Sequence, residues 1–246
     1  MATRHRSRRG LRLLGSLLLA GAPACAASGL QVMPIGLQLR HDAHADALWL
    51  SNTGDTPVQA QIRVFHWTQV DGKDQLEPSR GLLISPPMLS LAPGQRQLVR
   101  VIRSGPPPEQ QEDAYRVVVD ELPLPATART GLQFVLRYSI PVFLDPRSAV
   151  RGNVVLQSRW HDGPDGTYLQ VSNRGTAHAQ LAELYLRDAH GKRTLLKAGL
   201  LGYALPGSRM EWVLPATPRP AGSELLVRIN GEATEHTLAL DDDRSR

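Results

Sequence analysis

The chain has 246 residues, of which 41% are hydrophobic and 5% aromatic, and its formal net charge is +5. This excess of positive charge lies in the first 26 residues, which contain five of the 28 lysines and arginines and none of the 23 aspartates and glutamates. The remaining part of the chain is electrically balanced, so its composition excludes the strongly basic character typical of nucleic-acid-binding proteins.

The first 26 residues are typical of a secretory signal peptide. A basic head precedes the short apolar run LLGSLLLAGA, and Ala24-Cys25-Ala26 fits a small-x-small cleavage site. The apolar run is too short to span a membrane. We predict a mature chain that begins at Ala27. Two alternatives stay open: APAC resembles a lipoprotein cleavage box, with Cys25 lipidated, and SRRGLR resembles a twin-arginine signal.

The rest of the chain is predicted to be all-β. Short runs rich in Val, Leu, Ile and Tyr alternate with Gly, Pro, Asn and Asp, and no long amphipathic helix pattern occurs. Because Cys25 is the only cysteine, the mature fold has no disulfide and must be held together by packing. The predicted strands include residues 47–52, 58–65, 96–102, 115–122, 167–173 and 224–240, the last interrupted by the hairpin turn Asn230-Gly231.

The longest predicted strand lies in GLQFVLRYSIPVFLDP, residues 131–146. Every second side chain from Leu132 to Leu144 is apolar or aromatic, which is the two-residue period of a strand. Such a strand would span about 40 Å, roughly twice the usual length. Either the strand bends from one sheet or domain into another, or part of its apolar row is left open for another molecule.

Two sequence landmarks recur in the same order. Ser-Asn-x-Gly follows a predicted strand at residues 51–54 and again at 172–175, and a Pro-Gly turn follows at Gly94 and at Gly207. We therefore predict two immunoglobulin-like β-sandwich domains of about 100 residues, joined at an angle and lacking the Cys-Trp-Cys core. The signal peptide (1–26) precedes the first domain (27–147) and the second (148–246).

The sequence contains no enzyme signature that we recognise. It has no Gly-x-Ser-x-Gly elbow, no phosphate-binding loop, no His-Glu-x-x-His helix and no cysteine in the mature chain. His41 and His44 lie near two aspartates, and His161-Asp162 lies in a turn-like sequence, but both groups are more typical of solvated surface residues than of metal ligands. We expect no enzyme activity, no cofactor and no metal.

Nearly all of the mature chain resembles the PapD-like family, the periplasmic chaperones of chaperone-usher pilus assembly. The resemblance is strongest in LSNTGDTPV, ISPPMLSLAPGQRQLVRVIR, AYRVVVDELP and RYSIPVF, and the last is more similar to the divergent, archaic-type branch. In this family the chaperone lends a strand to a pilus subunit that lacks its own last strand. The resemblance implies that Leu132, Phe134 and Leu136 enter the subunit, and that the chaperone passes the subunit to an outer-membrane usher.

One departure from the family concerns the end of the bound subunit. Family members usually hold the subunit's C-terminal carboxylate with an arginine and a lysine, and the matching positions here are Gly36 and Pro141, which cannot bind it through their side chains. Arg116 is our candidate replacement, because a guanidinium grips a carboxylate with two hydrogen bonds. Arg40 and Arg137 are weaker alternatives.

Further interpretations concern self-association and alternative functions. An exposed apolar edge is an aggregation hazard, so self-association of the unloaded protein is expected. The alternative function from another class is a secreted carbohydrate-binding or adhesion sandwich in which the long strand is entirely core, and a secreted hydrolase is a third, weaker interpretation.

Overall fold

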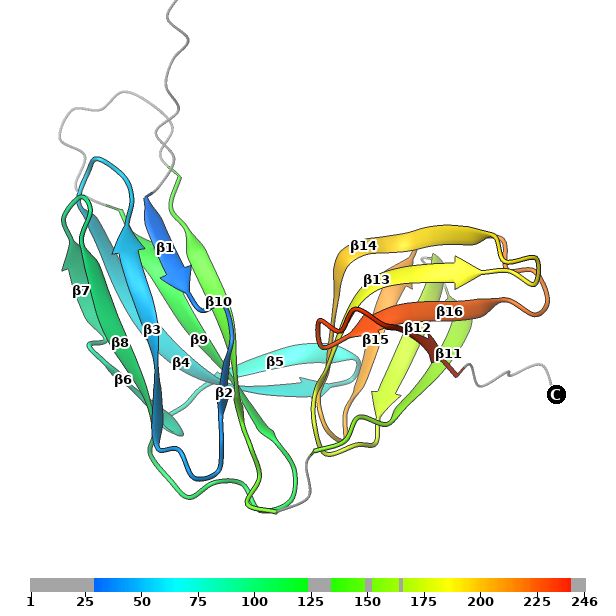
Figure 1. The fold of residues 1–246 in the computed structure, drawn as a ribbon, viewed down its shortest axis with the longest axis horizontal. Coiled ribbons are helices and arrows are strands. Elements are labelled where there is room, and N and C mark those ends of the chain that lie inside the picture. The colour runs from blue at the N-terminus through cyan, green and yellow to red at the C-terminus, as the bar shows by residue number, and fades with distance from the viewer. Residues whose placement is uncertain (1–28, 124–133, 149–151, 164–165, 240–246) are drawn as a thin grey trace, which may run out of the picture.

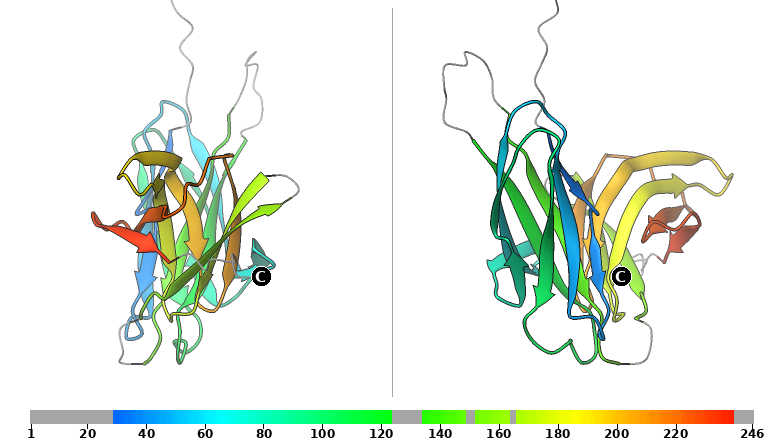
Figure 2. Two further views of the ribbon diagram at one scale, coloured as in Figure 1. Left: turned by 90° about the vertical axis from the view of Figure 1, so that its right-hand side faces the viewer. Right: turned by 60° about the vertical axis from the view of Figure 1, so that its left-hand side comes forward.

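The structure is a computed structural model that describes residues 29–123, 134–148, 152–163 and 166–239. The described residues form strands, turns and loops, with no helix and therefore no helix that could cross a membrane. Two β-sandwiches lie at an angle to each other, as the views in Figure 1 and Figure 2 show. The predicted fold class, all-β with two immunoglobulin-like domains, is confirmed.

The described residues of the first domain form ten strands in two sheets. One sheet has the order β1-β3-β8-β6, and the other has the order β2-β10-β9-β4-β5, with β7 beside β4. The strands are β1 (Leu30–Met33), β2 (Leu37–Leu39), β3 (Ala45–Asn52), β4 (Val58–Val70), β5 (Lys73–Pro78), β6 (Leu82–Ser85), β7 (Met88–Leu91), β8 (Arg96–Arg103), β9 (Asp113–Leu122) and β10 (Arg137–Leu144).

In the second domain, the residues that the structure describes form seven strands in two sheets, with the orders β11-β12-β15 and β14-β13-β16-β17. Its strands are β11 (Leu156–Gly163), β12 (Gly166–Asn173), β13 (Ala179–Arg187), β14 (Arg193–Ala204), β15 (Arg209–Leu214), β16 (Glu224–Ile229) and β17 (Glu235–Leu238). Residues 149–151 lie outside the described ranges, so the boundary between residues 147 and 148 stays a prediction.

Alternation along the strands builds the core of each domain. Inward-facing side chains of both sheets, such as Leu50, Val99, Val117 and Val142, are fully buried in the first domain. The second domain has its own separate core of the same kind.

The repeated asparagine ties the end of one strand to the start of another in both domains. The Asn52 side chain donates hydrogen bonds to the carbonyl oxygens of Thr56 (2.8 Å) and Leu91 (3.0 Å) and accepts one from the Gly54 N–H (2.9 Å). Asn173 makes the same three bonds to Ala177, Ala204 and Gly175, at 2.8, 3.0 and 2.9 Å. Each buried amide thus satisfies backbone groups that its loop would otherwise leave unpaired.

The repeated Pro-Gly turns meet these asparagines. Gly94 (φ 75°) and Gly207 (φ 69°) adopt the positive φ that a type II turn requires at its third residue. Their N–H groups donate to the carbonyl oxygens of Asn52 and Asn173, each at 2.9 Å. The ordered repeat in the sequence therefore corresponds to one structural unit that occurs in both domains.

Three local predictions are modified. β10 begins at Arg137, whereas the alternation had predicted a strand from Leu132. His161 lies within β11, whereas its sequence had suggested a turn. The Asn230-Gly231 turn is present, with φ of 50° and 72°, but the connection between β16 and β17 extends to residue 234.

The two domains share a third, smaller core. Trp67, Ala114 and Phe143 of the first domain are buried against Leu205 of the second, with Tyr203 packed beside them. The β4–β5 hairpin extends from the first domain to the second (Figure 1), where its turn residue Gly72 forms a bridge to Met210 of β15. The angle between the domains is therefore held by direct packing.

Candidate functional site

The apolar row of β10 divides into a buried part and an exposed part. Ile140, Val142 and Leu144 are at most 3% exposed and belong to the core of the first domain. Phe134 and Leu136, the continuation of the same row, are 62% and 36% exposed. Of the three residues predicted to enter a partner, Leu132 lies outside the described residues, and the other two are open to solvent.

Two acidic residues at the end of β9 contact the start of β10. The Leu136 N–H donates to the Glu121 side chain (3.0 Å), and the Leu136 carbonyl accepts the Glu121 N–H (2.9 Å), so one backbone bond of the ladder remains at this pair. Asp120 is ion-paired with Arg137 and, at 2.6 Å, with Arg63 of β4. Burial acts to raise the pKa of Asp120, but the hydrogen bonds from the two arginines outweigh it and hold that pKa below its usual value.

One edge of β10 has a partner strand over only part of its length. β2 pairs in parallel with residues Val142 to Leu144, because the chain passes from β1 in the opposite sheet to β2 just before this point. From Arg137 to Pro141 the only strand that pairs with β10 among the described residues is β9, on the other side. Backbone hydrogen-bonding groups on the open side are available to another strand.

The three positions discussed for the carboxylate anchor adjoin one another at the point where this open edge ends. A Cβ atom on Gly36 would lie 3.7 Å from Pro141 Cγ, and Pro141 is the register partner of Arg116 on β9. Arg116 thus stands directly beside the two positions that lack a charged side chain. The family resemblance suggested Gly36 and Pro141 as the usual anchor positions and Arg116 as the replacement, and the structure brings the three residues together.

The Arg116 guanidinium is partly buried and lies against aromatic rings. Its Cζ atom is 3.7 Å from the centre of the Trp67 ring and 5.1 Å from that of Tyr203, which belongs to the second domain. Its hydrogen bond to Ser139 O is long, at 3.4 Å, and it forms no ion pair with any described residue. Burial lowers the pKa of Arg116, while Tyr203 and Asp74 act to raise it.

The other two candidate arginines are already engaged. Arg40 is paired with Asp42 at 2.6 Å on the surface, and Arg137 is paired with Asp120. Asp42 is also one of the two aspartates that lie near His41 and His44 in the sequence. The described residues contain no cluster of three or more histidine, cysteine or acidic side chains that could hold a metal ion.

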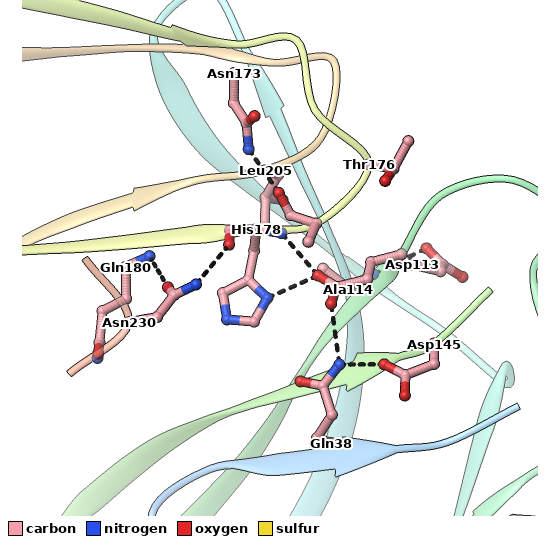
Figure 3. Close-up of polar contacts among 12 residues, drawn as sticks. Gln38, Asp113, Ala114, Asp145, Asn173, Thr176, His178, Gln180, Leu205 and Asn230 are labelled. Atoms are coloured by element: carbon pink, nitrogen blue, oxygen red, sulfur yellow. Dashed lines mark hydrogen bonds and ion pairs between the residues drawn. The ribbon is translucent and has the colours of Figure 1, made fainter. Parts of the chain in front are cut away.

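A polar clasp joins the domains beside this site (Figure 3). Glu112 accepts hydrogen bonds from the backbone N–H and from Nδ1 of His178, both at 2.7 Å, and from Gln38 of β2 at 3.0 Å. Gln38 also donates to Asp145. The His178 ring stacks on Phe143 of β10, with ring centres 3.5 Å apart and planes 3° from parallel. The clasp therefore connects the second domain to β2, to β10 and to the residue that precedes β9.

Sequence reasoning did not find the residues between the domains. Phe143 and Ala114 lie on the outer face of their strands, and two apolar residues at paired positions on an outer face were the available signal for a covered surface. Glu112 and His178 lie 66 residues apart in the chain, and no local pattern indicates that they meet.

Comparison with known proteins places the chain in a family. Residues 29–149 match the family of pili and flagellar-assembly chaperones, through the PapD N-terminal domain. The chain belongs to this PapD-like chaperone family. No curated protein matches the chain by sequence alone.

Solved structures of PapD-like chaperones are similar over both domains. The CsuC–CsuE chaperone–tip adhesion subunit complex from archaic Csu pili of Acinetobacter baumannii is matched at 26% identity and a TM-score of 0.68, covering 86% of this chain and 97% of that one. The SafB chaperone complex with the SafA pilin of Salmonella enterica is matched at 18% identity and 0.61 (86% and 96%), and the CupB2 chaperone of Pseudomonas aeruginosa at 19% and 0.59 (85% and 100%). The latter two matches support the fold.

Proposed function

We propose that this PapD-like chaperone captures pilus subunits in the periplasm by lending them β10 and the segment before it. One observation carries the proposal: the apolar row of β10 continues past the core as exposed side chains, at Phe134 and Leu136, next to an open strand edge. Leu132 completes the proposed donor row. The complexes of the similar chaperones CsuC and SafB with their subunits support this assignment, and the Csu match supports an archaic-type pathway.

The physics of capture follows from the open edge. A subunit strand that pairs with Arg137 to Pro141 gains main-chain hydrogen bonds that do not depend on its sequence. The exposed side chains of the donor row then fill the groove of the subunit. Burying each large apolar side chain contributes roughly 1.5–3 kcal/mol before the costs of ordering are subtracted.

Arg116 is proposed to hold the C-terminal carboxylate of the subunit. It lies at the level of Pro141, where the open edge ends and β2 closes the strand. A chain end held there would place the preceding residues along the open edge. Anchoring of the carboxylate and pairing of the strand would then support the same register.

Further parts of the proposal concern export and delivery. A cleaved signal peptide would carry the protein to the periplasm, and an outer-membrane usher would receive the loaded subunit. Capture and release by strand exchange require neither catalysis nor a cofactor. The unloaded protein is expected to cover its open edge by self-association, because an exposed strand edge with apolar side chains promotes pairing.

Co-purification from the periplasm tests subunit capture. A tagged wild-type chain is compared with a Phe134→Asp, Leu136→Asp variant, and with a control in which two similarly exposed leucines of β14, Leu195 and Leu200, are changed to aspartate. We expect a pilin-like protein with the wild type and the control, and little with the donor variant. Equal recovery with all three proteins would reject the proposed donor row.

A peptide assay tests the anchor separately. The probe is a fluorescein-labelled octapeptide of alternating threonine and valine, made with a free C-terminal carboxylate or with a C-terminal amide. A charge-assisted pair of about 1.5–3 kcal/mol predicts that the carboxylate form binds roughly ten- to 150-fold more tightly. This preference should disappear in Arg116→Gln. A preference that survives the substitution would exclude Arg116 as the anchor.

A further inference from the structure

Tyr203 of the second domain provides one of the two aromatic rings that Arg116 contacts. A buried side chain of the first domain, Gln69, donates a hydrogen bond to the Tyr203 backbone. From these contacts we infer that Gln69 is a positioning residue for the carboxylate anchor, because it fixes Tyr203 against the Arg116 guanidinium. This inference rests on the proposed role of Arg116. It adds that recognition of the chain end depends on both domains.

The contacts of Gln69 occupy its whole amide group. Its Nε2 donates to the Tyr203 carbonyl (2.9 Å) and to Asp74 Oδ1 (2.9 Å), and its Oε1 accepts the Leu205 N–H (2.8 Å). The residue is only 9% exposed. A buried amide with both its donors and its acceptor engaged is held in one orientation. It therefore fixes the backbone of the second domain at Tyr203 and Leu205 relative to β4.

The same network orients the second ring that contacts Arg116. The Trp67 indole N–H donates to Asp74 Oδ1 at 2.9 Å, so Trp67 and Gln69 share one carboxylate oxygen on β5. Trp67 and Tyr203 meet edge to face, with ring centres 5.2 Å apart and planes at 81°. Asp74 thus fixes the Trp67 ring and Gln69 fixes the backbone of Tyr203, while the Tyr203 hydroxyl accepts a hydrogen bond from Gln180 of its own domain at 2.8 Å.

These rings define the environment of the guanidinium. Stacking on an aromatic face leaves the in-plane N–H groups of an arginine available as donors. The neighbours of Arg116 in the sheet, Phe65 on β4 and Pro141 on β10, provide no charged partner. The position of the cation therefore depends on Trp67 and on a ring from the other domain.

Loss of the Gln69 amide would affect the anchor in two ways. The Tyr203 carbonyl would lose its hydrogen bond from β4, and Asp74 would lose one of the two donors that bind its Oδ1. Asp74 is close enough to Arg116 to influence its charge. A released Asp74 would compete with an incoming carboxylate for the same guanidinium.

The test compares Gln69→Met, which keeps the length of the side chain and removes its polar atoms, with Gln97→Met at an exposed position on β8. Binding of the carboxylate and amide forms of the threonine–valine octapeptide is measured for both variants and for the wild type. We expect the carboxylate preference to fall roughly tenfold in Gln69→Met, the size of one charge-assisted bond, with affinity for the amide form unchanged. Gln97→Met should behave as the wild type, and Gln69→Met should have no further effect in an Arg116→Gln background.

Each other outcome overturns a defined step. A wild-type preference that Gln69→Met retains would reject the positioning role and leave Arg116 as the anchor. An equal loss of affinity for both peptide forms would show that Gln69 only maintains the cleft, and would also reject that role. A wild type that binds both forms equally, or neither form, would reject the anchor and the inference together.

Discussion

Replacement of single side chains along the apolar row of β10 separates its core part from its donor part. Phe134 is 62% exposed and Ile140 is 2% exposed, although both lie on the same face of the strand and its extension. Truncation of an exposed side chain usually changes the free energy of unfolding by less than about 0.5 kcal/mol. Truncation of a buried isoleucine to alanine costs about 2–5 kcal/mol, because it removes buried apolar area and leaves a cavity. We therefore expect Phe134→Ala to unfold as the wild type and Ile140→Ala to be strongly destabilised.

The effects on subunit capture should run in the opposite order. Burial of the Phe134 side chain in a subunit is worth roughly 1.5–3 kcal/mol, so its loss should weaken capture by roughly ten- to 150-fold. Urea denaturation followed by circular dichroism measures the free energy of unfolding, and recovery of pilin-like protein per mole of tagged chain measures subunit capture. A destabilisation of Phe134→Ala comparable to that of Ile140→Ala would refute the reasoning, because Phe134 would then belong to the core.

Other predictions concern the residues that hold the fold and the domain interface. Burial acts to raise the pKa of Glu112, but hydrogen bonds from His178 outweigh it and the pKa is lowered. The contribution of Glu112 to stability should therefore be present above about pH 4.5 and be lost as pH falls through the folded-state pKa. In urea denaturation, Glu112→Gln should lose less free energy of unfolding over that pH range than the wild type. Asn52→Ala leaves buried backbone groups without partners and should lower the free energy of unfolding by about 1–3 kcal/mol; an unchanged value would argue against the structural role of the repeated asparagine. Gly94→Ala places a side chain at positive φ and should lower the melting temperature, at a cost of about 1 kcal/mol. Gly105→Ala should leave the melting temperature unchanged, because a Cβ atom there would meet no neighbour and Gly105 has no positive φ.

The proposed anchor at Arg116, which contacts one ring from each domain, would give the angle between the domains a functional role. In the first domain alone, Arg116 would keep Trp67 and lose Tyr203. The interdomain core and the Glu112–His178 clasp hold the second domain where its ring reaches this cation. On this view the second domain takes part in recognition through its position, even though the proposed donor strand belongs to the first.

The sequence alone determined the features that depend on local pattern. Alternation assigned the faces of β10, and the spacing of Asn52 and Gly94, repeated at Asn173 and Gly207, predicted two copies of one domain. These predictions succeeded because strand period and turn geometry depend on residues that are near one another in the chain.

Tertiary structure decided where the apolar row leaves the core and what surrounds Arg116. Strand period assigns a side chain to a face, but which element covers that face depends on how the sheets are ordered. The edge of β10 likewise has β2 as a partner only from Val142 onward, a limit set by the crossing of the chain from one sheet to the other. Gln69 meets Leu205 across 136 residues of sequence, and this contact exists only because the domains pack at one particular angle. No local pattern encodes that angle, since it results from the packing of complete domains against each other.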